Sequence, residues 1–411
     1  MEAWQMEKFM RSQKEAVQYL QNLPYRRATL VHHNDTDGIA SGAILKESLQ
    51  REGFQTENIP IERVHPSFLP KIHRPDRKLI FYADLGSQAA DLISQNIAAG
   101  THVIILDHHP PFHSSFSNLI QVNPEIYEID GDLKASAAAV AFFWAITLNK
   151  KNENLAYLGV LGAIGDHQMV EGKMCGLNQM ALEIALAKGV IHPAPQGPPF
   201  YRFPLFQGAW DYEVSRDITD LAVNGYYRRG AELALNVCLE GHSENSGRFV
   251  AEMRKIQEDR FQKEKEKIQT HGITYQGDIQ WLDVEGRLYP LGLKAIGIFC
   301  DEIINTDWVY GDKYIVGFQD LPRDTPLLGK FEGEDTKVSM RVPPTLHEDI
   351  VKGNKPNLAE ILPRAAKEAG GFAEGCHRFA AAGTVPKNNK SALICSLAKI
   401  VKNWPLSSPI R

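Results

Sequence analysis

Continuous apolar runs alternate with longer amphipathic stretches through the first half of the chain. The runs are short, rich in β-branched residues and bounded by turn residues, and they lie at 28–33, 78–86, 101–109 and 118–123. The stretches with helical composition and length are 39–53, 87–100 and 135–149. Runs that are apolar without alternation are typical of strands buried on both faces. The pattern therefore predicts an α/β fold with a mostly parallel sheet flanked by helices.

The second half begins with a different pattern. Residues 241–272 carry widely spaced apolar side chains amid dense charge, which predicts a long, largely solvated connecting helix. Apolar runs beyond it predict strands at 273–284, 293–300, 313–321 and 336–342, followed by a helix at 358–370 and a glycine-rich segment at 370–383. We therefore expect three parts: a first domain with a helical extension over 1–240, the connecting helix, and a smaller α/β domain over 273–411.

Bulk composition narrows the class of protein. A chain of 411 residues has room for two or three domains, and its formal net charge of -5 means that any nucleic acid must be held by local basic patches or bound metal. No apolar run approaches the roughly 18–20 residues that span a bilayer. The five cysteines lie far apart without a C-x-x-C pair. This spacing argues against a zinc ribbon or a disulfide framework and favours a reducing cytoplasm.

Acidic and histidine residues cluster at the ends of predicted elements. The clusters are His33-x-Asp35-x-Asp37-Gly38, Asp84-Leu85-Gly86, Asp107-His108-His109 and Gly165-Asp166-His167. Ligands of open α/β sheets bind beyond the carboxyl ends of the strands, so we expect these clusters to converge. Since alternate residues of an extended chain point the same way, His33, Asp35 and Asp37 are expected on one face.

The composition of these clusters indicates a metal centre. Clustered carboxylates repel one another unless a cation lies between them. Carboxylates with imidazoles and no thiolate suit Mn²⁺, Fe²⁺ or Mg²⁺ better than structural zinc. Four carboxylates and two or more histidines exceed the needs of one ion, and fit two ions about 3.5–4 Å apart with a bridging aspartate. Each cluster alone is more often a turn or a packing feature, so the combination carries the argument.

The chain resembles a known family at these positions. "HNDTDGIAS", "YADLGS", "LDHHP" and "GAIGDH" resemble the four motifs of the DHH phosphoesterase superfamily in order and spacing. "VSMR" and "GGFAEGCHRFAAAG" are similar to the DHH-associated C-terminal domain of the RecJ-like single-strand exonuclease and nanoRNase branch. The resemblance implies a catalytic domain within 1–240 and a substrate-binding domain within 273–411.

The resemblance also implies a ligand set for two Mn²⁺ ions, with Mg²⁺ as the alternative. It places His33, Asp35 and Asp84 on one ion. It assigns to the other ion the residues Asp37, Asp84, His108 and Asp166, so that Asp84 bridges. His32 stays open as an alternative to His33, which strand alternation favours. The catalytic residues implied are His109, beside the scissile phosphate, and Asp107, which would orient a neighbouring histidine.

Substrate binding is implied for the glycine-histidine loop of the second domain, which holds the phosphate and terminal nucleotide. The substrate-binding set comprises Arg341, Gly370, Gly371, Gly375, His377 and Ser136. The loop departs from the family in one place, because Cys376 stands between the glycine and the histidine. We interpret Cys376 as a packing residue rather than a catalytic thiol. The basic-aromatic stretches 199–204 and 224–230 either stack bases or pack in the core.

The function implied is that of a phosphoric-ester hydrolase, an exonuclease that degrades single-stranded DNA or RNA from an end in the cytoplasm. A cleft between two domains joined by a long helix would admit a strand but not a duplex. One alternative is a nanoRNase-like hydrolase of very short oligonucleotides, pAp or linearised cyclic dinucleotides. Another, ranked last because every expected ligand is present, is a replication-associated scaffold. The partners expected are single-stranded nucleic acid or short oligonucleotides and replication or repair proteins, with no membrane.

Overall fold

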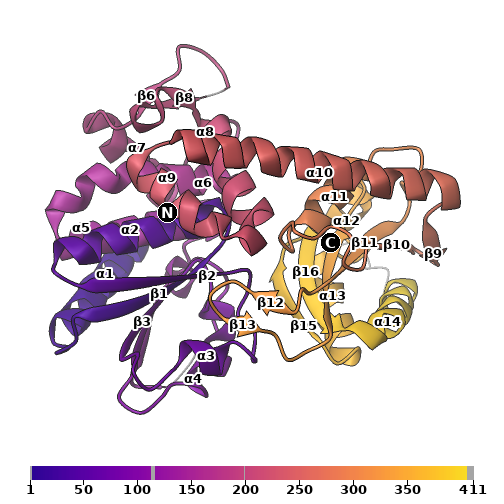
Figure 1. Ribbon diagram of the computed structural model, residues 1–411, viewed down its shortest axis with the longest axis horizontal. Coiled ribbons are helices and arrows are strands. Elements are labelled where there is room, and N and C mark those ends of the chain that lie inside the picture. The colour runs from indigo at the N-terminus through magenta and orange to yellow at the C-terminus, as the bar shows by residue number, and fades with distance from the viewer. Residues whose placement is uncertain (1, 113–115, 199, 405–411) are drawn as a thin grey trace. The chain divides into compact units, whose positions relative to one another are not determined.

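The computed structural model describes residues 2–112, 116–198 and 200–404. The chain divides into two compact units, Met1–Ala251 with Pro326–Leu328, and Glu252–Thr325 with Gly329–Arg411 (Figure 1). The predicted fold class is confirmed: a mostly parallel sheet flanked by helices, a long helix and a smaller α/β part. Within the described ranges, no helix combines the length and the apolar character that crossing a membrane requires.

A five-stranded parallel sheet forms the centre of the N-terminal unit. Its strands are β1 (Arg27–His33), β2 (Gln55–Ile61), β3 (Leu79–Ala83), β4 (His102–Leu106) and β5 (Leu119–Val122). They are ordered β2-β1-β3-β4-β5, and every neighbouring pair is parallel. The order reverses between β1 and β3, and ligands of such sheets bind beyond the carboxyl ends of the strands at this switch point.

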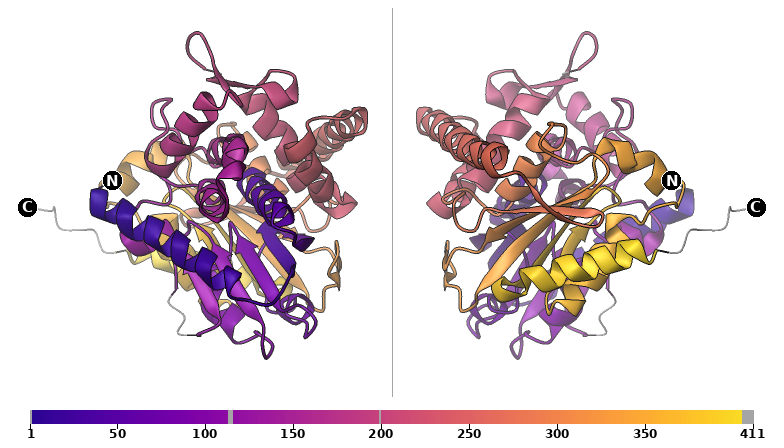
Figure 2. Two further views of the ribbon diagram at one scale, coloured as in Figure 1. Left: turned by 90° about the vertical axis from the view of Figure 1, so that its left-hand side faces the viewer. Right: turned by 90° about the vertical axis from the view of Figure 1, so that its right-hand side faces the viewer.

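Helices cover the sheet and supply most of the unit's core. They are α1 (Ala3–Gln21), α2 (Thr36–Arg51), α3 (Leu69–Ile72), α4 (Ala90–Ser94), α5 (Ala137–Leu148), α6 (Ala156–Gly165), α7 (Gly176–Ala187), α8 (Asp211–Thr219) and α9 (Gly230–Glu240). Helix α5 is apolar all round because it is enclosed, and α1 lies against α5 and β5 (Figure 2, left). The rings of Trp144 on α5 and Phe81 on β3 pack edge to face, with their centroids 5.4 Å apart.

One expectation for this unit needs correction, and one strand was not predicted. The helix expected over 87–100 is much shorter, because only Ala90–Ser94 is α-helical after a 3₁₀ turn at Ser87–Ala89. Strand β2 has no continuous apolar run, since its first four residues are exposed or half-buried at the edge of the sheet, and it therefore gives no strand signal. Edge strands with polar faces lack the pattern that marks central strands.

The basic-aromatic stretches pack into this unit. Tyr226 is buried, and its hydroxyl donates to the carbonyl of Pro60 at 3.1 Å. The hydroxyl of Tyr227 donates to Glu62 at 2.6 Å. In the other stretch Phe203 is fully buried, whereas Pro199 lies outside the described residues. Core packing is therefore the role of these three side chains. Phe203 ends β7 (Tyr201–Phe203), the middle strand of a small sheet with β6 (His192–Pro193) and β8 (Ala209–Trp210).

The C-terminal unit is built on a mixed six-stranded sheet. The helix α10 (Glu244–His271) leads into β9 (Thr274–Gln276), β10 (Ile279–Asp283), β11 (Tyr314–Asp320), β14 (Asp335–Arg341), β15 (Phe372–Cys376) and β16 (Ala380–Pro386). Only β10 and β11 pair in parallel within the order β15-β16-β14-β11-β10-β9. A small hairpin joins β12 (Asp324–Thr325) and β13 (Gly329–Lys330). The helices are α11 (Ala295–Ile303), α12 (His347–Val351), α13 (Leu358–Glu368) and α14 (Lys390–Lys402).

The strand predicted at 293–300 is wrong, because this segment forms α11. Its buried residues are spaced as on one helical face: Ala295, Ile296, Phe299, Cys300 and Ile303. A short apolar run fits a buried strand and a buried helix equally well, so the pattern alone does not separate them. Gly297 lets the helix approach β14 closely, because a Cβ there would lie 2.8 Å from the hydroxyl oxygen of Ser339.

Candidate metal centre

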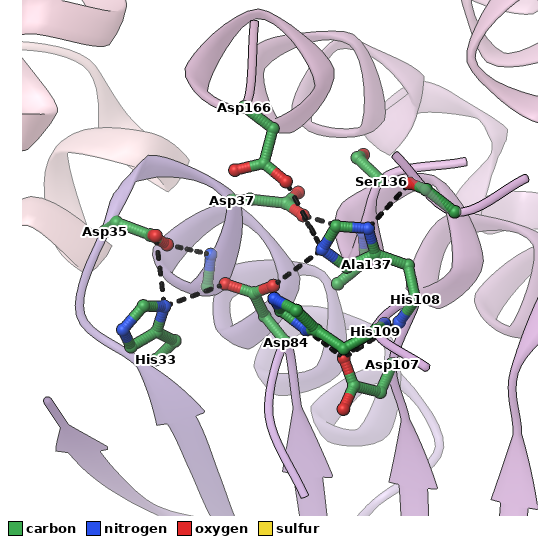
Figure 3. A network of polar contacts seen from close by, with 12 residues as sticks. His33, Asp35, Asp37, Asp84, Asp107, His108, His109, Ser136, Ala137 and Asp166 are labelled. Carbon is green, nitrogen blue, oxygen red and sulfur yellow. Dashed lines mark hydrogen bonds and ion pairs between the residues drawn. The ribbon is translucent and has the colours of Figure 1, made fainter. Parts of the chain in front are cut away.

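The four polar clusters converge at the carboxyl edge of the parallel sheet (Figure 3). Asp35 and Asp37 follow β1, Asp84 follows β3, and His108 follows β4, while Asp166 ends α6. Three sets of side chains each bring one potential ligand atom per residue within 4.8 Å of the others. Two of them make up the predicted ligands: His33, Asp35 and Asp84, and Asp37, Asp84, His108 and Asp166. The third joins Asp84 and His108 to Asp107 and His109, so Asp84 belongs to all three.

The cluster His33-x-Asp35-x-Asp37-Gly38 supplies residues to both predicted ligand sets, because a helix begins inside it. Strand β1 ends at His33, Asp35 is the N-cap of α2 and accepts from the amide of Gly38 at 3.0 Å, and Asp37 lies in the first helical turn. The expectation that His33, Asp35 and Asp37 share one face of an extended chain is therefore wrong. Gly38 is required here, since a Cβ would lie 2.4 Å from the carbonyl oxygen of His33.

The two adjacent histidines have different surroundings. His33 Nδ1 lies 3.0 Å from Asp35 Oδ2 and 3.2 Å from Asp84 Oδ2. The ring of His32 is fully buried against α2, where a Cβ on Gly42 would lie 2.6 Å from it, and its Nδ1 contacts the carbonyl of His33. Burial lowers the pKa of His32 to about 4. His32 is thus a neutral packing residue, and His33 is the histidine beside the carboxylates.

Asp37 is held by the amino end of α5. The amides of Ala137 and Ala138 donate to its two carboxylate oxygens at 2.7 and 2.8 Å. Ser136 is fully buried as the N-cap of α5, and its hydroxyl accepts from Ala139. The helix N-terminus stabilises the negative charge of Asp37. Gly162 leaves the space that the carboxylate needs, because a Cβ there would lie 2.1 Å from Asp37 Oδ1.

Burial, followed by repulsion among the carboxylates, governs the electrostatics of the cluster. Burial and the charges of Asp166 and Asp84 raise the pKa of Asp37 well above its ordinary value. Burial and the charge of Asp84 raise the pKa of Asp166 to about 6, against the opposing charge of His108. His108 Nε2 lies 3.3 Å from both Asp84 and Asp166. Burial alone would lower the pKa of His108, but these carboxylates raise it well above its ordinary value.

The donor set fits divalent cations. It offers four carboxylates and two imidazoles without a thiolate, which suits Mn²⁺, Mg²⁺ or Fe²⁺. A cation between the carboxylates would favour their charged forms against both burial and mutual repulsion. The cluster can therefore hold metal ions.

Asp107 and His109 form a pair beside this cluster. His109 Nδ1 donates to Asp107 Oδ1 at 2.8 Å, and the amides of His108 and Ser87 donate to the same carboxylate. Burial alone would raise the pKa of Asp107, but the charge and hydrogen bond of His109 hold it well below its ordinary value. Asp107 thus fixes the orientation of the His109 ring, which is the more exposed member of the pair.

Three residues around His108 were missed by sequence reasoning: Gly131, Gln168 and Asn178. The carbonyl of Gly131 lies 2.8 Å from His108 Nδ1 and also accepts from Gln168. Gln168 in turn accepts from Asn178. The position of Gln168 directly after Gly165-Asp166-His167 is the one signal that could have marked it. Gly131 and Asn178 carry no such signal.

The predicted substrate residues of the C-terminal unit lie on β14, β15 and the adjacent turns. Arg341 ends β14 and donates to Asp301 at 2.7 Å. Gly370, with φ of 73°, follows α13 in the left-handed conformation that favours glycine. Gly371 has no room for a Cβ, which would lie 2.0 Å from the carbonyl oxygen of Thr384. His377 is exposed in the turn before β16.

The departure at Cys376 is accommodated in the backbone. The pairing of β15 with β16 shifts register between Ala373 and Cys376, as a β-bulge does. Cys376 Sγ lies 3.6 Å from the carbonyl of Ala382, in a partly buried position consistent with packing. Gly375 is not required for space, because a Cβ there would meet no heavy atom within 4 Å.

Comparison with known proteins identifies the fold. Residues 27–163 match the family model described as "DHH family, N-terminal domain". An uncharacterized protein of Methanocaldococcus jannaschii is 32% identical over 188 residues, 44% of this chain and 41% of that protein. The chain therefore spans less than half the length of this relative.

Solved structures extend the likeness over nearly the whole chain. RecJ of Thermus thermophilus in complex with Mn²⁺ has a TM-score of 0.66 at 16% identity, covering 97% of this chain and 56% of RecJ. A manganese-bound exonuclease RecJ has a TM-score of 0.63 at 18% identity, covering 96% of this chain and 95% of that one. CDC45 of Entamoeba histolytica has a TM-score of 0.58 at 10% identity, covering 95% and 99%. The chain has a RecJ-like fold.

Proposed function

We propose that this chain, whose residues 27–163 form a DHH-family domain on a RecJ-like fold, is a divalent-metal-dependent phosphodiesterase. The observation that carries the proposal is the pair of ligand sets that share Asp84. Bound divalent ions would supply a water of lowered pKa and positive charge against the substrate phosphate. Mn²⁺ is the proposed metal, with Mg²⁺ as the alternative, because RecJ structures of the same fold are described with each ion.

The side chains of the cluster take separate roles in this proposal. His33 and Asp35 would bind one ion, and His108 and Asp166 the other together with Asp37. Asp84 would bind both. His109 would donate to the phosphate oxygens, and Asp107 would keep its ring in place through the 2.8 Å hydrogen bond to Nδ1.

The substrate class is the finer part of the proposal. We take it to be single-stranded DNA or RNA, degraded from an end. The part of the chain over 273–411 would hold the end of the strand, through Arg341 and His377 as phosphate-binding side chains and through the glycine loop at Gly370, Gly371 and Gly375. Replication or repair proteins are the protein partners proposed, in line with the RecJ-like and CDC45-like fold.

The test is digestion of end-labelled single strands of graded length, with 5′-phosphate or 5′-hydroxyl ends, in Mn²⁺. Progressive shortening of long strands is the expected result. Activity confined to two to five nucleotides would replace the exonuclease by an oligonucleotide hydrolase. Inactivity in both Mn²⁺ and Mg²⁺ would contradict the proposal and leave a replication-associated scaffold as the remaining alternative. The variant Asp76→Asn, at an exposed carboxylate paired with Arg74, serves as the control and should be fully active.

A further inference from the structure

We propose that Gln168 and Asn178 are positioning residues that set the metal-binding geometry of His108 and Asp37. This inference rests on the proposed function in one respect, since it takes His108 and Asp37 as metal ligands. The two amides lie behind the cluster, with Gln168 1% exposed and Asn178 fully buried.

The hydrogen bonds determine how the two amides are oriented. The backbone amide of Ser136 donates to Asn178 Oδ1 at 2.9 Å, so the Nδ2 atom of Asn178 faces the other way. Asn178 Nδ2 donates to Gln168 Oε1 at 2.7 Å. Gln168 must therefore present its NH₂ group, and Nε2 donates to the carbonyl of Gly131 at 2.9 Å. The chain of bonds leaves neither amide a second orientation that satisfies its partners.

This orientation fixes the ring of His108. Its Nδ1 lies 2.8 Å from the Gly131 carbonyl and 3.4 Å from Gln168 Nε2. Because the Gly131 carbonyl can only accept, the 2.8 Å contact requires Nδ1 to carry a proton. The lone pair of a neutral ring then lies on Nε2, which faces Asp84 and Asp166 at 3.3 Å. Partners that fix the ring nitrogen away from a metal govern how well the histidine binds it.

The same pair also connects to Asp37. Asn178 holds the backbone of Ser136, and the next two amides of that helix end, at Ala137 and Ala138, bind the carboxylate of Asp37. Gly131 is held from its other side, since its amide donates to Glu125 at 2.5 Å and a Cβ on it would lie 2.0 Å from the His108 carbonyl oxygen. One buried pair thus positions two ligands that come from different elements.

The experiment measures Mn²⁺ dissociation constants by calorimetry without nucleic acid. Gln168→Met removes the amide at nearly constant volume, and we expect the dissociation constant to rise about 10- to 100-fold. Gln13→Met is the matched control: Gln13 is fully buried in the same unit and donates to the carbonyl of Val140 at 3.3 Å rather than to a proposed ligand or to Gly131. It should lower the melting temperature as Gln168→Met does, but leave the Mn²⁺ affinity within about twofold.

A Gln168→Met chain that binds Mn²⁺ as tightly as Gln13→Met would overturn the proposal, because its amide would then be only structural. Should Gln168→Met not fold, Gln168→Asn keeps the amide but shortens its reach, and an unchanged dissociation constant in that variant would overturn the proposal equally. If the wild-type chain binds Mn²⁺ but shows no nuclease activity, that result would contradict the proposed function and leave the positioning role of Gln168 and Asn178 standing.

Discussion

Two carboxylate clusters, one in each unit, differ in what neutralises them. In the N-terminal unit Asp37, Asp84 and Asp166 surround the imidazole of His108, and His33 lies on the other side of Asp84. In the C-terminal unit Asp320 forms ion pairs with Lys387 and Lys390, with Nζ–Oδ distances of 2.7 and 2.6 Å. Lys390 also pairs with Asp283 at 2.8 Å. Both clusters lie at strand ends.

The difference shows in the direction of the pKa shifts. Burial alone would raise the pKa of Asp320, but the two lysines lower it below its ordinary value. The pKa values of Asp37 and Asp166 are raised instead, because burial raises them and the neighbouring carboxylates add to the shift. A cluster with its own ammonium groups is a complete structural feature, whereas the cluster around His108 gains stability from an added cation. Proximity of acidic residues is thus a weaker criterion for a metal site than whether lysine side chains already neutralise them.

The largest effect should come from removing the shared carboxylate. Asp84→Ala takes one ligand from both sets, and we expect the rate of oligonucleotide hydrolysis to fall by about 10³-fold or more, as when a main source of transition-state stabilisation is lost. Asp320→Ala should leave the rate within about twofold. Initial rates on an end-labelled strand decide this, and equal losses in the two variants would contradict the distinction between the clusters.

Mn²⁺ binding at the cluster around His108 should raise the free energy of unfolding, and this gain should not depend on the cluster around Asp320. With free Mn²⁺ at about 100 times its dissociation constant, binding adds about 2.7 kcal/mol to the free energy of unfolding. For a unit of this size that corresponds to a rise in melting temperature of about 5–10 °C, which a chelator should reverse. The rise should persist in Asp320→Asn and vanish in Asp84→Asn. Scanning calorimetry of both variants with and without Mn²⁺ measures this. A rise in melting temperature that persisted in Asp84→Asn would mean that the ion binds outside this cluster.

Removing the charge of the lysine-paired carboxylate should affect stability alone. Asp320→Asn leaves Lys390, which is 15% exposed, with a weaker partner, and we expect a loss of about 1–2 kcal/mol in the free energy of unfolding. Urea denaturation measures it. The exposed pair of Arg74 and Asp76 provides the contrast, because Asp76→Asn should cause no measurable loss.

The smallest effect is the pH dependence of that loss. Since the pKa of Asp320 is lowered in the folded chain, its stabilising contribution is complete above the pKa of the unfolded state and is lost as the pH falls through the folded value. The stability difference between wild type and Asp320→Asn should therefore be constant near neutral pH and shrink below about pH 4. If the stability difference between wild type and Asp320→Asn grew on acidification, the pKa of Asp320 would be raised in the folded chain rather than lowered.

Local patterns determined most of the architecture. Four of the five parallel strands follow from continuous apolar runs, because a strand buried on both faces requires apolar residues at successive positions. Strand β2 and helix α11 were not predictable in this way. The first lies at an edge with a polar half, and the second is an apolar run too short to reveal its period.

The sequence by itself also determined that the acidic and histidine clusters converge, since polar residues at the carboxyl ends of parallel strands must meet at one edge. Only the tertiary structure decided which of His32 and His33 faces the carboxylates, that a helix begins between Asp35 and Asp37, and that Gln168 and Asn178 stand behind His108. These outcomes depend on hydrogen bonds between segments far apart along the chain. No local pattern records such partners, because each is selected by the space and polarity that the folded core leaves around it.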